Sequence, residues 1–139
     1  DSWRLTGTPE HSDPVHFIQM WVLPDTPGIN PGYQQLDIND QLDSMGLAVV
    51  ASGLAEHLHT TAIHIAQSRA GLLAGRLAPG ERQGLPTAPR LHLFVAVGAV
   101  ELESGERLEA GDSARMSESG GIAVTAGSAG AEILVWQMH

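Results

Sequence analysis

Histidine is the residue type in this chain whose spacing could support chemistry. His57 and His59 flank a single leucine, and His64 follows five residues later. Residues two apart on a β-strand point to the same face, so these rings could converge with His64 on a metal ion. However, no carboxylate stands at ligand spacing, because Glu56 lies directly beside His57. The alternative, which we favour, is a group of loop histidines that precede a strand.

The other histidines are each explained without catalysis. His92 lies between two leucines, so it points outward if those leucines face the core. His16 interrupts an apolar run, where we expect a hydrogen-bonded structural histidine. We expect His11 in a solvated loop and His139 at a frayed terminus.

Covalent and phosphate chemistry have little support in this sequence. It contains no cysteine, which excludes disulfides, thiolate metal sites and thiol nucleophiles. Ser117 and Ser119 lie in a Gly/Ser loop without a nucleophile elbow, and Gly120-Gly121 is not a nucleotide fingerprint. Two acidic pairs fit a solvated strand face: Glu101 with Glu103, and Glu106 with Glu109. We therefore expect no catalytic, cofactor-binding or metal-binding residue in this chain.

The length of the chain limits the number of its domains, and its charge limits the classes of partner that it can bind. Its 139 residues fit one ordinary domain. The net charge of −9, with every basic residue an arginine, disfavours direct contact with nucleic acid or anionic membranes. No apolar run reaches the roughly 18 residues that span a bilayer, and no signal sequence is visible, so we expect a cytoplasmic protein. Because the chain begins with Asp1 rather than methionine, we expect either that a segment was removed or that the sequence records only part of a longer product.

Short apolar segments separated by Gly/Pro turns predict an all-β protein. Turns recur about every eight to twelve residues, which favours a jelly-roll barrel or sandwich. The expected strands cover residues 46–52, 62–66, 71–77, 91–97, 99–102, 107–108, 114–116, 121–125 and 131–138. The expected turns lie at residues 78–80, 103–106, 111–112 and 126–130. We expect residues 36–45 to be irregular with a short turn, and Trp3 with Leu5 to form a possible edge strand.

The apolar run at residues 15–23 is the first long one in the chain. Only His16 and Gln19 interrupt it, so we expect a strand that is buried on both faces. The loop that follows is rich in proline and glycine, which cannot continue a strand ladder. We therefore expect an extended N-terminal arm that crosses between two structural units.

Glycine turns at residues 80, 98 and 111 have the outline of the two motifs of cupins. Cupin motifs place three histidines and a glutamate inside a barrel, where they hold a metal such as iron, manganese or nickel. Here the ligand positions are occupied by other residues: Leu85, Thr87, Leu91 and Ile122. The sequence therefore resembles a degenerate cupin with an apolar interior and no metal site of the usual kind.

The segment FIQMWVLPDTPGINPGYQQ is similar to the linker that joins the halves of pirin-family proteins. That linker has the form Q-x-W-x-x-P…G-x-x-P-x-Y-x-Q, which is matched here by Gln19, Trp21, Pro24, Gly28, Pro31, Tyr33 and Gln35. The segments LHTTAIHIAQSRAG, LEAGDSARMSESGGIAVTAG and AEILVWQM follow the second half of the family in order. The resemblance covers nearly the whole chain.

The resemblance implies a fold, a place within a larger protein and two possible roles. Pirin-family proteins are bicupins that include quercetin 2,3-dioxygenases, and an iron-type metal lies in their N-terminal cupin. Residues 1–44 then correspond to the interdomain arm with the crossover strand, and residues 45–139 to the metal-free C-terminal cupin. The parent protein would act on a flavonol-like substrate. Alternatively, the chain is a non-catalytic cupin that serves as a binding or interaction module, or part of a pirin-type transcriptional co-regulator.

The arm also predicts self-association. If the chain lacks a preceding half, residues 15–23 lose part of their covering. Exposed apolar strands tend to pair with other chains. We therefore expect a homodimer or a swapped arm.

Overall fold

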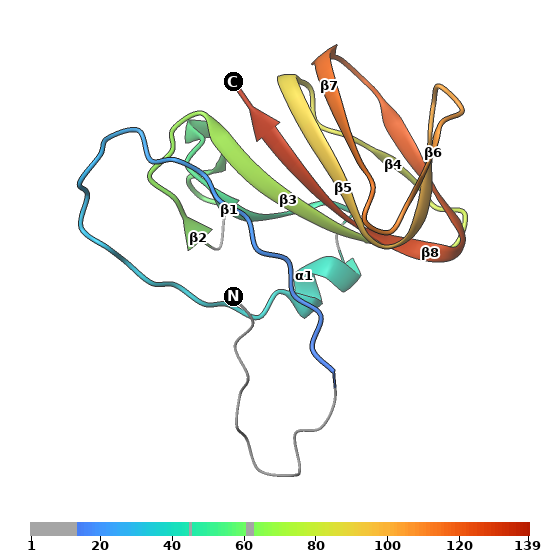
Figure 1. Cartoon of the computed structure of the whole chain (residues 1–139), viewed down its shortest axis with the longest axis horizontal. Coiled ribbons are helices and arrows are strands. Elements are labelled where there is room, and N and C mark those ends of the chain that lie inside the picture. Colours follow the sequence, from blue (N-terminus) through green and yellow to red (C-terminus); the bar gives the residue numbers. More distant parts are fainter. Residues whose placement is uncertain (1–13, 45, 61–62) are drawn as a thin grey trace.

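A computed structural model of the chain describes residues 14–44, 46–60 and 63–139. The predictions for Trp3, Leu5 and His11 concern residues outside these ranges. Eight strands of the described chain form one sheet, of which the main path runs in the order β2-β1-β3-β8-β5-β6. β4 pairs with β8 and β7 pairs with β5, so the sheet branches and curls (Figure 1). The all-β prediction is confirmed.

The strands vary widely in length, and β5 and β8 are the longest of them. Their bounds are β1 Ala48–Ser52, β2 Ile63–His64, β3 Ala70–Leu77, β4 Arg82–Gly84, β5 Ala88–Leu102, β6 Arg107–Glu109, β7 Ser113–Ser119 and β8 Ala123–Met138. β1 and β2 are parallel, whereas the other pairs are antiparallel. Two short helices complete the described elements, α1 Asn39–Ser44 and the 3-10 helix η1 Ala55–His57.

β5 and β8 pair along most of their length and share one corner. On β5, Gly98 pairs with Ala131, and Val100 pairs with Ala126. Residues 127–130 of β8 therefore bulge out opposite Ala99, and a bulge bends a strand while leaving it in the sheet. The corner divides β8 into a half that pairs with β4 and a half that pairs with β3.

The core lies inside this curled sheet. Leu93, Val95, Val124 and Val135 are completely buried, because alternate side chains of β5 and β8 point inward. The cluster combines residues from both sides of the corner: Leu73, Leu77, Leu91, Leu93, Val95, Ile133 and Val135 on one side, and Leu85, Val100, Leu108, Val124 and Ala126 on the other.

Several predicted elements differ from the observed ones. The turn predicted at residues 126–130 is wrong, since β8 continues through it, and the strands predicted at 91–97 and 99–102 are one strand. Glycines with positive φ at Gly98 and Gly130 produce bulges rather than reversals. β4 was not predicted, and α1 replaces part of the irregular segment at residues 36–45.

The apolar run at residues 15–23 is not a buried strand. It is an extended arm outside the sheet, and it passes β1 and β3 before it swings out and returns to α1 (Figure 1). Ile18 and Met20 are half-buried toward the sheet, whereas Trp21 is 88% exposed. The prediction failed because an apolar sequence indicates that a segment needs a partner, without indicating what covers each face.

No helix in the described ranges is long and apolar enough to cross a membrane.

Candidate functional site

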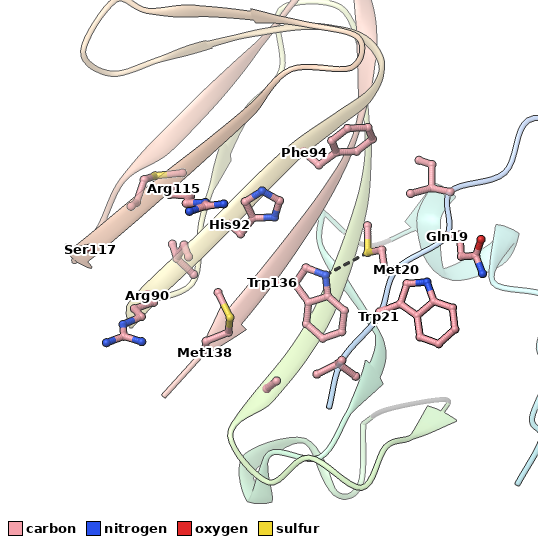
Figure 2. A pocket seen from close by; sticks show the side chains of 15 residues that line it. Gln19, Met20, Trp21, Arg90, His92, Phe94, Arg115, Ser117, Trp136 and Met138 are labelled. Carbon is pink, nitrogen blue, oxygen red and sulfur yellow. Dashed lines mark hydrogen bonds between the residues drawn. The ribbon is translucent and has the colours of Figure 1, made fainter. Parts of the chain in front are cut away.

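A cavity of about 630 Å³ lies between the arm and the outer face of the sheet. The arm forms one wall, and β5, β7 and β8 form the other (Figure 2). Aromatic and sulfur-containing side chains share the lining with two arginines and a histidine. The lining residues are Ile18, Gln19, Met20, Trp21, Val22, Ala70, Arg90, Leu91, His92, Phe94, Arg115, Met116, Ser117, Trp136 and Met138.

Strand register brings the polar and aromatic side chains of the cavity together. His92 on β5 pairs with Trp136 on β8 and, on its other side, with Arg115 on β7. Arg90 lies two residues before His92, so both side chains project to the same outer face. Phe94 continues this row along β5 (Figure 2). Three neighbouring strands therefore place two arginines and a histidine on the sheet face that also carries Trp136, with His92 between Arg115 and Trp136.

The arm is attached to the sheet at defined points. The Trp136 indole N–H donates to the Met20 sulfur, with 3.0 Å between Nε1 and Sδ (Figure 2). Further along, the Gln67 side-chain amide donates to the Leu23 carbonyl at 2.8 Å, and the Asp25 N–H donates to the Ala66 carbonyl at 2.8 Å. These bonds fix residues 20–25 over the sheet edge and leave the outward-facing side of the arm exposed.

The barrel interior does not fit a metal ion. Leu85 and Leu91 belong to the buried core, and Ile122 packs against it. Their hydrocarbon side chains supply no ligand atom. Thr87 is exposed, so spacing from Gly98 did not place this residue inside the barrel. Within the described ranges, no group of three or more histidine, aspartate or glutamate residues is arranged to hold a metal ion.

The three histidines at residues 57, 59 and 64 do not converge on one point. His57 lies in the 3-10 helix η1, whereas His59 and His64 are exposed. The His57 Nδ1 atom lies 2.9 Å from Ser52 Oγ, which also accepts a hydrogen bond from the Leu54 N–H at 3.1 Å. Ser52 is only 1% exposed, so this serine–histidine pair stabilises the loop and is closed to a substrate.

The remaining described histidines differ in part from expectation. His16 is exposed, which contradicts the expectation that the run at residues 15–23 is a strand buried on both faces. His139 is not frayed, since its N–H donates to the Arg69 carbonyl at 2.9 Å and its ring lies 3.3 Å from the Gln137 amide. His92 does point away from the core, as predicted, but it lines the cavity.

Three arginines of the sheet pair with carboxylates. Arg76 bonds to Asp43 at 2.7 Å and to Glu132 at 3.2 Å, which connects α1 to β3 and β8. Hydrogen bonding to these two carboxylates raises the pKa of Arg76 above its usual value. Arg82 pairs with Glu103, and Arg107 pairs with Glu109.

Sequence reasoning missed Arg90, Arg115 and Trp136 as site residues. They lie on three different strands, so they come together only through register. One signal was present: on β5, polar and aromatic side chains alternate with the core leucines, which indicates that the second face of this strand lies outside the core.

Comparison with known proteins connects the chain with one family. Residues 50–138 match the model of the quercetinase C-terminal cupin domain. Proteins of Mycobacterium bovis and Mycobacterium tuberculosis that carry the provisional name quercetin 2,3-dioxygenase are 44% identical over 128 residues. The match covers 92% of this chain and 51% of each relative, so the chain spans about half the length of these relatives.

Solved structures support the fold. YhhW from Escherichia coli superposes with a TM-score of 0.71 at 21% identity, over 86% of this chain and 48% of YhhW. YhaK from the same organism gives a TM-score of 0.63 at 21% identity, over 79% of this chain and 47% of YhaK. At this level of identity the likeness concerns the fold alone.

Proposed function

Because this chain belongs to the quercetinase C-terminal cupin family of pirin-like proteins, we propose that it is the metal-free half of a quercetin 2,3-dioxygenase-like oxidoreductase. In this proposal the preceding half holds an iron-type metal and performs the oxygen chemistry on a flavonol-like substrate. The present chain supports that half and contributes no metal ligand. We place the complete protein in the cytoplasm, in keeping with the absence of cysteine.

One observation supports the assignment of the metal to the preceding half and of a metal-free role to this chain. The spacing that would place metal ligands in a cupin barrel falls on Leu85, Leu91 and Ile122, which belong to or pack against the apolar core. Introducing a metal there would bury charge without ligands, and burial of an unpaired charge is strongly unfavourable. A catalytic metal therefore belongs elsewhere in the longer protein.

Elemental analysis and turnover test this proposal together. We expect the purified 139-residue chain to bind no stoichiometric metal, and we expect a full-length protein containing it to bind one metal and consume quercetin and O₂. The assignment of a metal-free role to this chain would be overturned if the 139-residue chain held a stoichiometric metal that was lost on replacing His57 and His59 by alanine. A metal-loaded full-length protein that leaves quercetin unchanged would remove the dioxygenase assignment and favour a co-regulator.

A second candidate function is a ligand-binding module, and the cavity beneath the arm favours it. Its volume falls in the range of about 300–1,000 Å³ that is usual for small-molecule sites. Titration with aromatic ligands separates this role from a purely structural one.

We also propose that the isolated chain forms a homodimer or exchanges its arm. Phe17 is 65% exposed, Trp21 88% and Leu23 83%, so the outward side of the arm offers apolar surface to a second copy. Sedimentation over a wide concentration range measures this. A monomer at every concentration would contradict it.

A further inference from the structure

We propose that the cavity between the arm and the β5–β7–β8 face binds a small planar aromatic carboxylate. The inference goes beyond the proposed dioxygenase role and rests on the second candidate function, the ligand-binding module, because it names the class of ligand for a site on the outer face of this chain that needs no metal. It follows from three features of the described chain: unpaired cations, their position beside aromatic rings, and a wall that a ligand can contact on both sides.

The first feature is the charge pattern. The chain carries more than twice as many acidic as basic residues, so an arginine has many potential partners. Arg76, Arg82 and Arg107 each have an acidic partner. Within the described ranges, Arg90 and Arg115 have none, and both line the cavity. Arg69 also lacks one, but it does not line the cavity. Two cations left unpaired at one cavity of an acidic protein favour an anionic ligand.

The second feature is where those cations lie relative to the aromatic rings. Arg115 and Trp136 flank His92 on opposite sides of β5. Neighbouring strands are about 4.8 Å apart, so the backbones that carry Arg115 and Trp136 are about 10 Å apart. A ligand with an anionic group at one end and a ring system at the other can contact both. Guanidinium forms paired hydrogen bonds to carboxylate, which makes a carboxylate the anion that best fits.

The third feature is the lining opposite the sheet. Met20 of the arm points toward the sheet across a cavity whose lining includes Phe94 and Met138, whereas the Trp21 ring is largely exposed (Figure 2). The Trp136 N–H is already bonded to Met20, which holds the edge of the indole ring and leaves its apolar faces for ring contacts. Flat aromatic ligands exploit such surfaces better than aliphatic ones, because a ring contacts a ring over its whole face. The apolar part of the ligand is therefore aromatic.

The test uses 2-naphthoate as the probe, with the uncharged 2-naphthamide as its matched analogue. Isothermal titration and tryptophan fluorescence measure binding to the 139-residue chain. We expect 2-naphthoate to bind at least about tenfold more tightly than 2-naphthamide. We expect the double variant Arg90→Gln/Arg115→Gln to lose about tenfold in affinity for 2-naphthoate, with little change for 2-naphthamide. Tenfold corresponds to one lost charge-assisted contact at an exposed site.

Arg107→Gln is the control for charge alone. Arg107 is exposed, lies on β6 and pairs with Glu109, so its replacement removes a positive charge away from this cavity. We expect this variant to bind 2-naphthoate as the wild type does. Ile18→Ala, which shortens a half-buried side chain of the arm wall, should weaken both probes alike.

Three results would overturn the proposal. Equal binding of the two probes would show an apolar site without anion recognition. Equal losses in Arg107→Gln and in the double variant would show a general charge effect. If the chain were a dimer, and 2-naphthoate neither bound to that dimer nor dissociated it, the cavity would be assigned to contact with a second copy of the chain. None of these results bears on metal content or quercetin turnover, so this proposal and the proposed function can fail independently.

Discussion

The corner between β5 and β8 makes a quantitative prediction for Gly98→Ala. Gly98 has φ of 76°, a backbone conformation that costs an ordinary residue about 1–2 kcal/mol. A Cβ atom at this position would lie 2.1 Å from the Gly130 carbonyl oxygen and 3.0 Å from the Ala131 Cα atom. Both atoms belong to the backbone of β8, so they cannot move aside as a side chain would. Substitution must therefore shift the corner itself.

Gly105→Ala separates the two contributions. Gly105 has φ of 87° in the β5–β6 hairpin loop, and a Cβ atom there would meet no atom within 4 Å. This control has the backbone cost of about 1–2 kcal/mol, partly offset by about 0.4–1 kcal/mol from a less flexible unfolded chain. Gly98→Ala has the same two contributions and adds overpacking of about 1–3 kcal/mol, which gives a total loss of about 1–5 kcal/mol.

Urea unfolding followed by tryptophan fluorescence and circular dichroism measures both losses. The free energy of unfolding of Gly98→Ala should fall clearly below that of Gly105→Ala, with a similar urea dependence for both variants. Since typical domains are stable by about 5–15 kcal/mol, the expected loss is a large fraction of the total. If the two variants were equally stable, the close approach of β5 and β8 at this corner would be refuted.

Three further predictions concern the core, the buried serine and the arm. Leu93→Ala, at a completely buried position, should lower the free energy of unfolding by about 2–5 kcal/mol in the same urea assay. Ser52→Ala should cost about 1–3 kcal/mol, because the Leu54 N–H and the His57 ring lose their shared partner, whereas Ser113→Ala at an exposed position should cost little. Gln67→Ala removes the bond to the Leu23 carbonyl, so limited proteolysis should cut residues 14–25 faster, while a rate equal to that of the wild type would mean that this bond does not hold the arm.

Sequence reasoning worked best where a turn depends on local chemistry. The hairpin at Gly105 and the turns at Gly80 and Gly111 were predicted from glycine, and all three glycines have positive φ. It failed at Gly130, which also has positive φ but sits in a bulge within β8. Glycine permits both outcomes, and only the partner strand decides between them. The family resemblance, drawn from the arm and later segments, agreed with the match to residues 50–138.

Candidate sites were harder to predict, since the relevant distances are non-local. The nearby pair His57 and His59 attracted attention because the two residues are close in sequence, yet their environments differ. In contrast, His92 and Trp136 are 44 positions apart in the sequence and pair across two strands. A single sequence contains the alternation along β5 but not the register that places Trp136 beside it.

The arm that forms one wall of the cavity also couples two events. A molecule that contacts both Met20 and Arg115 is held fully only while the arm stays attached, so its affinity and the attachment are reciprocally linked. A protein that binds residues 14–19 and detaches the arm would then weaken ligand binding by the same factor by which the ligand weakens the binding of that protein.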